Sequence, residues 1–317
     1  MSVPKSLFVA TIQGATASGK SNFALELARY LNTEIISADS RQIYKFMDIG
    51  TAKPSPQDRK KVQHHLIDII TPDQYYNAGK FARAARSIIC GLNDEGKIPL
   101  IVGGTGFYIK SLLEGLAIIP EIPGNIKKDL IKKHQEKNNQ QLYDYLTSVD
   151  PAAASRINVQ DRQKLLRAIS VYEFTGQPIS HYWQKQKSET GLQSYNILMS
   201  RDREILYRKI DERLDKMIES GLLNEIEDLL NRGYKEDDPG LRSVGYQEFI
   251  PYLQKGTDLK QCLELAKQHT RNYAKRQLTW LKKIEFDLTL DASSINFSQI
   301  YKDIGDSLRR TYDSCYS

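Results

Sequence analysis

The chain has 317 residues, of which 40% are hydrophobic and 26% charged, and its formal net charge is +6 at pH 7. This composition excludes a disordered or fibrous protein, and the length fits one large α/β domain with or without a smaller attachment. Cys90, Cys262 and Cys315 are odd in number and lack C-x-x-C spacing, which argues against a disulfide framework and a zinc site. The N-terminal apolar run is too short to cross a bilayer, so we expect a cytoplasmic protein without membrane attachment.

The first third of the sequence alternates strand patterns with helix patterns. Short apolar runs predict strands, and apolar residues three and four apart predict helices. We expect strands at residues 7–13, 34–38, 65–70 and 99–104, and helices at residues 21–31, 78–96 and 107–116. The second helix is closed by Gly96, a residue type that is typical of helix C-caps. The alternation predicts a parallel sheet with crossover helices.

The pattern changes near residue 120, after the proline-punctuated segment "AIIPEIPGN". The following residues have helical periodicity and many polar side chains, until a strand pattern returns in "YNILMS". We therefore expect a helical insertion at 120–192 within a five-stranded core made by residues 1–119 and 193–317. Charged helical patterns fill most of the chain after residue 203. The predicted fold class is an α/β protein with a P-loop nucleoside-kinase-like parallel sheet core, a helical insertion domain and a helical C-terminal region.

The segment "GATASGKS" follows the first predicted strand and matches the pattern G-x-x-x-x-G-K-[ST]. A glycine-rich turn between a strand and a helix lets successive main-chain N–H groups converge on phosphate oxygens. The residues expected to bind phosphate groups are Gly14, Ala15, Thr16, Ala17, Ser18, Gly19, Lys20 and Ser21. Within this loop, we expect Lys20 to reach the terminal phosphate and the Ser21 hydroxyl to bind Mg²⁺.

The acidic residues argue against an ATPase. Phosphate-loop ATPases add an apolar strand that ends in an acidic residue, whereas the strand at 99–104 ends in glycines and Asp68 follows only two apolar residues. Asp39 directly follows the strand at 34–38, at the edge where open α/β sheets bind ligands. A carboxylate there can accept a proton from a nucleophile that attacks a group attached to the bound phosphate. Two functions stay open: a small-molecule kinase, and an enzyme that transfers the carbon group and releases the phosphates.

Basic residues gather in three helical stretches, at 125–137, at 162–168 and near the C-terminus. In the last stretch, basic and aromatic residues are interleaved: Lys267, Arg271, Tyr273, Lys275, Arg276, Trp280, Lys282 and Lys283. Residues four apart share a helix face, and a basic face with aromatic rings suits an RNA backbone and unstacked bases. Three basic stretches around one phosphate site favour a polyanionic partner over a small metabolite.

Seven segments carry a resemblance to a known family: "GATASGKS", "ISADSRQIYKFMDIGTAKP", "HHLIDI", "IVGGTGFYIKSLLEGL", "DRQKLLRAISVYEFTGQPIS", "DDPGLRSVGYQEF" and "RNYAKRQLTWLKK". On these segments, which occur in order over nearly the whole chain as far as residue 285, the sequence resembles the tRNA dimethylallyltransferases, also called tRNA isopentenyltransferases. The resemblance implies that the phosphate loop holds the diphosphate of dimethylallyl diphosphate. The acceptor would be N6 of adenosine 37, in tRNAs that read codons beginning with U, and the products N6-(dimethylallyl)adenosine and diphosphate.

The resemblance also implies roles for individual residues. Asp39 corresponds to the general base, Thr105 to a residue between diphosphate and adenine, and Arg213 to an arginine that helps Lys20 hold the diphosphate. The residues implied to contact tRNA are Asp39, Ser40, Arg41, Gln42, Thr105, Lys127, Gln163, Lys164, Leu165, Leu166, Arg167, Arg242, Ser243, Val244, Gly245, Tyr246, Gln247, Lys275, Arg276, Gln277, Leu278, Thr279, Trp280, Leu281 and Lys282. We expect the insertion to grip the anticodon stem-loop while the adenine flips out of its stack, with Mg²⁺ as cofactor and the chain acting as a monomer.

The sequence departs from the family pattern at a few positions. Ala15 stands where the family often has Pro, and Ser21 where it often has Thr; neither change removes a needed amide or hydroxyl. "GYQEF" stands where many members have "GYRQ", which bears on a tRNA contact. The alternatives are an adenylate isopentenyltransferase acting on free AMP, ADP or ATP, and a small-molecule phosphate-loop kinase. An RNA-binding module without catalysis is disfavoured because Lys20, Ser21 and Asp39 are all present.

Overall fold

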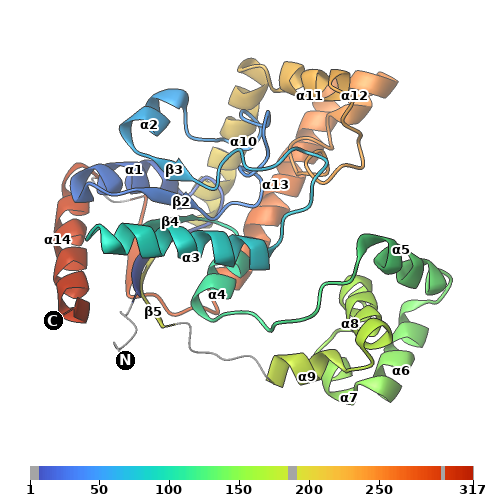
Figure 1. Ribbon diagram of the computed structural model, residues 1–317. Coiled ribbons are helices and arrows are strands. Elements are labelled where there is room, and N and C mark those ends of the chain that lie inside the picture. The colour runs from blue at the N-terminus through green and yellow to red at the C-terminus, as the bar shows by residue number, and fades with distance from the viewer. Residues whose placement is uncertain (1–6, 185–190, 294–296, 317) are drawn as a thin grey trace. The chain divides into compact units, whose positions relative to one another are not determined.

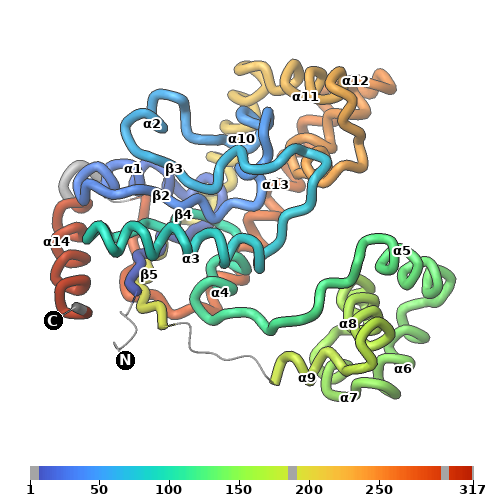
Figure 2. Tube along the Cα trace, viewed as in Figure 1, coloured from blue at the N-terminus to red at the C-terminus, as the bar shows by residue number. Residues whose placement is uncertain are grey.

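The computed structural model describes residues 7–184, 191–293 and 297–316 (Figures 1 and 2). The chain divides into two compact units, one made of Met1–Leu113 with Gly191–Ser317 and the other of Glu114–Thr190. The first unit contains a sheet covered by helices, and the described part of the second consists of helices. Within the described residues, no helix combines the length and the apolarity that crossing a bilayer requires.

One parallel sheet organises the larger unit. In the described chain it has six strands: β1 (Leu7–Gln13), β2 (Ile35–Ser37), β3 (His64–His65), β4 (Leu100–Gly103), β5 (Leu192–Ser200) and β6 (Leu288–Asp291). Their order is β3-β2-β4-β1-β5-β6, so β1 lies inside the sheet, where Ile12 is in register with Val102 and Ile197. All seven residues of β1 are buried, as expected for a parallel strand covered on both faces. The sheet confirms the predicted α/β class.

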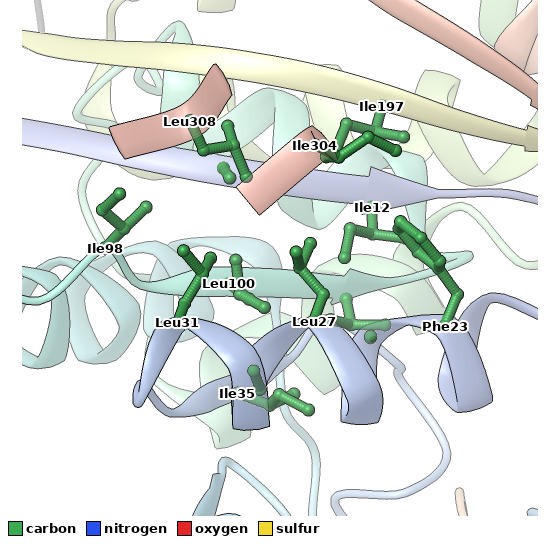
Figure 3. Close-up of a cluster of buried hydrophobic side chains, with 14 of the residues drawn as sticks. Ile12, Phe23, Leu27, Leu31, Ile35, Ile98, Leu100, Ile197, Ile304 and Leu308 are labelled. Carbon is green, nitrogen blue, oxygen red and sulfur yellow. The ribbon is translucent and has the colours of Figure 1, made fainter. Parts of the chain in front are cut away.

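Helices cover both faces of this sheet (Figure 1). Helices α1 (Lys20–Leu31) and α14 (Phe297–Tyr316) pack on one face, and α3 (Ala78–Asp94) and α4 (Gly106–Leu113) on the other. Side chains alternate along β1, so that Ile12 meets α1 while Val9 meets α3. Figure 3 shows the hydrophobic cluster on the face covered by α1 and α14. In it, Leu27 and Leu308 pack with strand residues such as Ile12. Burying each such side chain contributes roughly 1.5–3 kcal/mol, which makes this core a rigid support for the loops at the strand ends.

The sheet differs from the prediction at β6, at β3 and at the start of β5, which begins at Leu192 instead of residue 195. Strand β6, which pairs with β5, was not expected, because only Leu290 of its four residues is buried and the sequence there lacks an apolar run. The strand expected at 65–70 is wrong beyond its first residue. Leu66 and Asp68 have φ of 60° and 57°, which interrupts an extended chain, and the sheet pairing is limited to His64–His65.

The end of α3 confirms the predicted glycine C-cap. Gly96 has a φ of 71°, in the left-handed region. Its N–H donates to the carbonyl of Asn93 at 3.0 Å, and the N–H of Lys97 donates to the carbonyl of Leu92 at 2.9 Å. These two bonds satisfy carbonyls that the helix itself leaves unpaired, and they turn the chain toward β4.

The predicted helical C-terminal region consists of α10 (Arg203–Glu219), α11 (Leu222–Asn231), α12 (Ile250–Lys255) and α13 (Leu259–Leu281). These helices share a buried cluster with Ile43, Tyr44 and Met47, which lie between β2 and the short helix α2 (Pro56–Lys61). Ala15 of the phosphate loop belongs to the same cluster. The C-terminal helices therefore pack directly behind the predicted phosphate site.

The smaller unit has its own hydrophobic core. Its helices are α5 (Gly124–Lys133), α6 (Asn139–Val149), α7 (Pro151–Ala154), α8 (Arg162–Thr175) and α9 (Ile179–Gln184). Leu142, Leu146 and Ile169 are fully buried in this core. Arg162, part of one predicted basic stretch, donates to the carbonyls of Lys137 and His134 after α5, at 2.6 and 3.1 Å. That arginine therefore closes the end of a helix, which corrects its interpretation as part of a free basic surface.

Candidate active site

The phosphate loop turns sharply between the buried strand β1 and helix α1. Gly19, the last residue before α1, has a φ of 94°, a left-handed conformation that glycine adopts without strain. The N–H of Ser18 donates to the carbonyl of Ala15 at 3.2 Å, which closes the turn. Nζ of Lys20 donates to the same carbonyl at 3.2 Å, so the ammonium lies over the loop. The predicted cradle is thus a strand–turn–helix loop at the positive end of the α1 dipole.

Three charged groups act on one another beside this loop: Lys20, Arg213 of α10 and Asp39 after β2. Desolvation lowers the pKa of Lys20 to about 8, although the negative charge of Asp39 opposes this effect; the positive charge of Arg213 lowers it further. Desolvation also lowers the pKa of Arg213, again opposed by Asp39. Two desolvated cations with only one neighbouring carboxylate favour the binding of a further anion, which would compensate their lost hydration.

Asp39 and Thr105 meet at the carboxyl ends of two neighbouring strands. Oδ1 of Asp39 accepts the N–H of Arg41 at 2.8 Å, which orients the carboxylate. The hydroxyl of Thr105 accepts the N–H of Ser40 at 3.0 Å, and the Thr105 N–H donates to the carbonyl of Ala38 at 3.2 Å. Because β2 and β4 are adjacent and parallel, their ends bring together residues that are far apart in sequence.

Tyr273 of α13 joins Asp39 and Thr105. Burial raises the pKa of Tyr273 and the charge of Asp39 adds to the rise, while Arg41 and a hydrogen bond with Thr105 lower it. The phenol therefore keeps its proton at neutral pH and lies within the site. The sequence pattern placed Tyr273 on a basic, RNA-facing helix face; the structure places this side chain in the wall of the cavity, and its stacking on an RNA base stays a prediction. Its helical position among buried residues such as Ala274 and Gln277 was the available signal.

A cavity of about 520 Å³ opens beside the loop, with walls from the ends of β2 and β4 and from α10 and α13. Its volume suits a small organic ligand. The predicted site residues in its wall are Thr16, Lys20, Ser21, Asp39, Arg41, Gln42, Arg213, Ser243, Val244, Gly245, Tyr246, Arg276 and Gln277. Leu214 and Met217 add an apolar surface. The cavity therefore combines an anion-binding end with an apolar wall and a carboxylate.

Comparison with known proteins identifies the family. The model of the IPP transferase family matches residues 42–284, and that of an isopentenyl transferase family matches residues 7–74. The chain belongs to the IPP transferase family. A tRNA dimethylallyltransferase of Carboxydothermus hydrogenoformans is 43% identical over 280 residues, which cover 86% of this chain and 88% of that protein. Another from Magnetococcus marinus is 44% identical over 275 residues, covering 85% of this chain and 90% of that protein.

Solved structures of related proteins share the fold. A tRNA isopentenylpyrophosphate transferase from Staphylococcus epidermidis has a TM-score of 0.69 and 35% identity, covering 96% of this chain and 99% of that chain. A eukaryotic dimethylallyltransferase acting on tRNA has a TM-score of 0.79 and 28% identity, covering 96% of this chain and 78% of that one. The sheet and its surrounding helices are therefore the fold of this transferase family.

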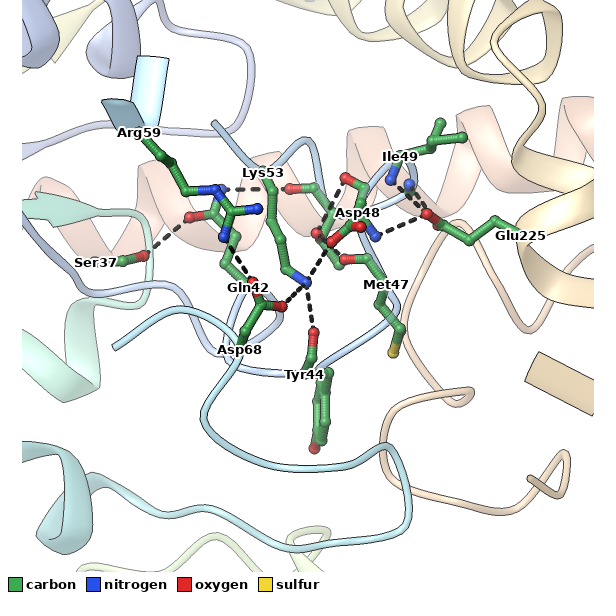
Figure 4. A network of polar contacts seen from close by, with 12 residues as sticks. Ser37, Gln42, Tyr44, Met47, Asp48, Ile49, Lys53, Arg59, Asp68 and Glu225 are labelled. Carbon is green, nitrogen blue, oxygen red and sulfur yellow. Dashed lines mark hydrogen bonds and ion pairs between the residues drawn. The ribbon is translucent and has the colours of Figure 1, made fainter. Parts of the chain in front are cut away.

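In this family member, a polar network holds the segment between Gln42 and Lys53, which forms one wall of the cavity (Figure 4). Oε1 of Gln42 accepts the Ser37 hydroxyl at 2.9 Å, and its Nε2 donates to the carbonyl of Ala52 at 3.2 Å. Lys53 pairs with Asp68 and with Asp48. The amide of Gln42 thus supports the wall, and its contact with tRNA stays a prediction. Asp68, engaged by Lys53, serves this network.

Glu225 of α11 anchors the outer turn of the same segment (Figure 4). Its carboxylate accepts the N–H groups of Asp48, Ile49 and Gly50 at 2.8, 2.7 and 3.1 Å, and the hydroxyl of Tyr246 at 2.6 Å. Charge-assisted bonds of this kind are stronger than neutral ones. Glu225 could not be identified from the sequence, because a single acidic residue on an amphipathic helix does not indicate which groups it will bind.

The predicted tRNA-contacting residues 242–247 are divided between surface and interior. Arg242 and Gln247 are exposed, whereas Ser243, Gly245 and Tyr246 are buried and Val244 is half-buried. The buried carboxylate of Glu248 accepts the N–H of Gly245 at 2.8 Å and the amide of Gln247 at 3.0 Å. Any RNA contact at the buried positions must therefore come from main-chain atoms or from the cavity side.

Helix α13 has an outer and an inner face. Lys275, Arg276, Thr279 and Lys282 are exposed, Leu278 is half-buried, and Gln277 and Leu281 are buried. Trp280 packs against α4, with its ring centroid 6.4 Å from that of Phe107. The prediction that Lys267 and Arg271 belong to a free basic stripe is wrong. They form ion pairs with Asp215 and Asp211 of α10, at 2.7 and 2.6 Å. Exposed basic residues are gathered in the C-terminal part of the helix, at Lys275, Arg276 and Lys282.

The predicted residues of the smaller unit lie on two of its helices. Lys127 is exposed on α5. Gln163, Lys164 and Arg167 are exposed on α8, where their spacing places them on one face. Leu165 is fully buried and Leu166 packs against the same core, so these two residues orient the polar face. The unit thus presents amide and cationic groups in a pattern suited to phosphates.

Proposed function

We propose that this protein transfers the dimethylallyl group from dimethylallyl diphosphate to N6 of adenosine 37 in tRNAs that read codons beginning with U. The observation that carries this proposal is the cavity in which Lys20, Arg213 and Asp39 converge on the phosphate loop. Family membership and the tRNA dimethylallyltransferases that resemble the chain support the substrate pair. The products are N6-(dimethylallyl)adenosine in tRNA and diphosphate.

The reaction breaks one bond and forms one. The bond between the allylic C1 and the diphosphate oxygen breaks, and both of its electrons leave with diphosphate. N6 of adenine forms the new bond to C1 and loses a proton, which the carboxylate of Asp39 accepts. The Arg41 N–H that holds Oδ1 of Asp39 keeps the carboxylate oriented toward the cavity. No redox partner is required.

Stabilisation of the leaving group supplies most of the acceleration. The exocyclic amine of adenine is a weak nucleophile because its lone pair is delocalised, whereas an allylic carbon ionises readily once its leaving group is stabilised. Lys20, which bonds to the carbonyl of Ala15, and Arg213 line the cavity beside the main-chain N–H groups of the loop, where all of them would stabilise the charge that develops on the diphosphate. The pKa of Lys20 is lowered to about 8 in the free protein, and a bound diphosphate would raise it and keep the ammonium charged at higher pH.

Mg²⁺ is part of this proposal, and the residues present fit it. The exposed hydroxyl of Ser21 at the start of α1 and the nearby carboxylate of Asp39 are oxygen donors of the kind that Mg²⁺ prefers, with diphosphate and water as the other ligands. Within the described residues, no group of three His, Cys, Asp or Glu side chains could hold a metal by itself. When bound, the ion would neutralise charge on the diphosphate.

The tRNA part of the proposal uses surfaces outside the cavity. The adenine must leave the anticodon stack to reach Asp39, so base flipping is required. The exposed face of α8 with Arg167 and the exposed end of α13 with Lys282 would hold the backbone of the stem-loop. We propose that the chain acts as a monomer, because one stem-loop requires one cavity. The free cysteines Cys90, Cys262 and Cys315 fit a reducing compartment such as the cytoplasm.

A transfer assay tests the proposal against its alternatives. The protein is incubated with Mg²⁺, labelled dimethylallyl diphosphate and either unmodified tRNA or AMP, and the nucleosides are separated after digestion. Label on adenosine 37 of tRNA is the expected result. Label on AMP but not on tRNA would establish an adenylate isopentenyltransferase instead. Phosphorylation that requires ATP, without prenyl transfer, would establish a kinase.

A further inference from the structure

Gln277 connects three elements of the site through one side chain. It lies on the inner face of α13 and is 8% exposed. Its Oε1 accepts the N–H of Thr16 in the phosphate loop at 2.9 Å. Its Nε2 donates to the carbonyl of Gly104, at the end of β4, also at 2.9 Å. The carboxamide thus bridges the phosphate loop and the strand end that precedes Thr105.

The site requires glutamine in this orientation. The partner in the loop is a donor and the partner after β4 is an acceptor, and a carboxamide supplies one acceptor and one donor at matching reach. The fit is also close, because a Cβ on Gly104 would lie 2.2 Å from Nε2 of Gln277. Leaving a buried main-chain N–H or carbonyl unpaired is unfavourable, so removing the amide should let the loop and α13 move relative to each other.

The residues next to Gln277 on α13 face both the cavity and the predicted RNA-binding surface. One turn earlier on α13, Tyr273 lies beside Asp39, and Arg276 lines the cavity. The adjacent outer face carries the exposed residues Lys275, Thr279 and Lys282. The same helix therefore reaches the predicted RNA surface on one side and the phosphate loop on the other.

We propose that Gln277 is a positioning residue that couples helix α13 to the phosphate loop, so that tRNA engaged on α13 and diphosphate engaged in the loop favour each other's binding. This inference rests on the proposed function and goes beyond it, because it replaces a direct contact between Gln277 and tRNA by an internal bridge. By reciprocity, whatever tRNA adds to diphosphate affinity, diphosphate adds equally to tRNA affinity.

The test compares Gln277→Leu with Gln268→Leu, a change of the same residue type at an exposed position of the same helix. Four quantities are measured: the Kd for inorganic pyrophosphate without tRNA, the KM for dimethylallyl diphosphate, the Kd for tRNA, and Tm. We expect Gln277→Leu to raise the pyrophosphate Kd and the KM roughly tenfold, as the loss of one or two buried hydrogen bonds implies. The tRNA Kd without diphosphate should stay unchanged, and saturating tRNA should no longer tighten pyrophosphate binding. Gln268→Leu should behave as wild type.

A second variant reaches the bridge from the other side. Gly104→Ala keeps the Gln277 side chain but puts a methyl group 2.2 Å from its Nε2, which must shift, and 3.2 Å from the carbonyl oxygen of Gly14, so it should reproduce the weaker pyrophosphate binding. It also provides the test if Gln277→Leu does not fold.

The outcomes distinguish the Gln277 bridge from a direct contact between Gln277 and tRNA, and both from a failure of the proposed function. Unchanged pyrophosphate Kd and KM in a folded Gln277→Leu or Gly104→Ala protein that prenylates normally would overturn the bridge. Weakened tRNA binding with normal pyrophosphate binding would show that Gln277 contacts tRNA directly, which also overturns it. Wild-type protein that binds neither pyrophosphate nor dimethylallyl diphosphate would instead refute the proposed function.

Discussion

The two units of this protein carry their predicted functional residues in different ways. In the α/β unit, Lys20, Asp39, Arg213 and Tyr273 come from four separate elements and meet in a cavity where burial shifts the pKa of Lys20 and Arg213. In the helical unit, the exposed polar residues of α8 lie on one face of a single helix, oriented by the buried Leu165. Charges that converge in a cavity act strongly on a reacting group, whereas charges spread along a helix face act weakly but additively on a polyanion. We therefore expect changes at these cavity residues to affect chemistry, and changes on the exposed face of α8 to affect tRNA affinity.

The largest effect is expected for Asp39→Asn. The amide keeps the shape of the side chain but cannot accept the proton from N6, so kcat should fall by roughly 10²–10⁴-fold. The Kd for tRNA should change little, because the lost proton acceptor does not bind RNA phosphates. Single-turnover kinetics with labelled dimethylallyl diphosphate measures the first quantity and filter binding the second. Turnover near the wild-type rate would show that another group takes the proton.

Glu225→Ala tests how much the cavity wall depends on its anchor. Three main-chain N–H groups and the Tyr246 hydroxyl lose their common acceptor. We expect the free energy of unfolding to fall by about 2 kcal/mol, since water can replace only part of this set. Chemical denaturation measures the change, and Glu227→Ala, an exposed position on the same helix, serves as control. Equal stability of the two variants would contradict the anchoring role.

The lowered pKa of Lys20 predicts a pH dependence of diphosphate binding. The ammonium of the free protein is charged below about pH 8 and neutral above it. The affinity for dimethylallyl diphosphate should therefore fall as the pH rises through about 8, by roughly tenfold between pH 7 and 9 as the charged fraction declines. Calorimetric titration across this range measures it. Lys20→Arg keeps its charge at these pH values and should flatten the curve. An equally steep curve in that variant would assign the titration to another group.

The smallest effect is expected for Arg167→Ala in the helical unit. Removing this one exposed cation should weaken tRNA binding about fivefold at moderate salt and lower the slope of log Kd against log salt by about one, with kcat unchanged. Filter binding at several salt concentrations measures both. Lys302→Ala removes an exposed cation from α14 and should leave binding unchanged. A fall in kcat in Arg167→Ala would remove the distinction between the two units.

The sequence by itself determined the parts of the fold that are local. The apolar run 7–13, the glycine-rich turn and the helix after it have strong patterns, and the C-cap at Gly96 needs one residue with positive φ. The sequence also predicted a helical unit. A long polar stretch with helical periodicity interrupts the alternation of strands and helices, and such a stretch does not fit inside a buried parallel sheet. Strand β6 lacked such a pattern, since a short edge strand with one buried side chain gains its pairing from β5.

Only the tertiary structure decided which residues meet. Gln277 and Thr16 are 261 positions apart, and Glu225 and Gly50 are 175 apart, so no local pattern reports their contacts. Lys267 and Arg271 had the spacing of an RNA-binding face, but α10 places carboxylates opposite them. Tyr273, from the same stretch, turns into the cavity beside Asp39. Spacing along a helix fixes which residues share a face, whereas the packing of other elements decides whether that face meets solvent, a carboxylate or the active site.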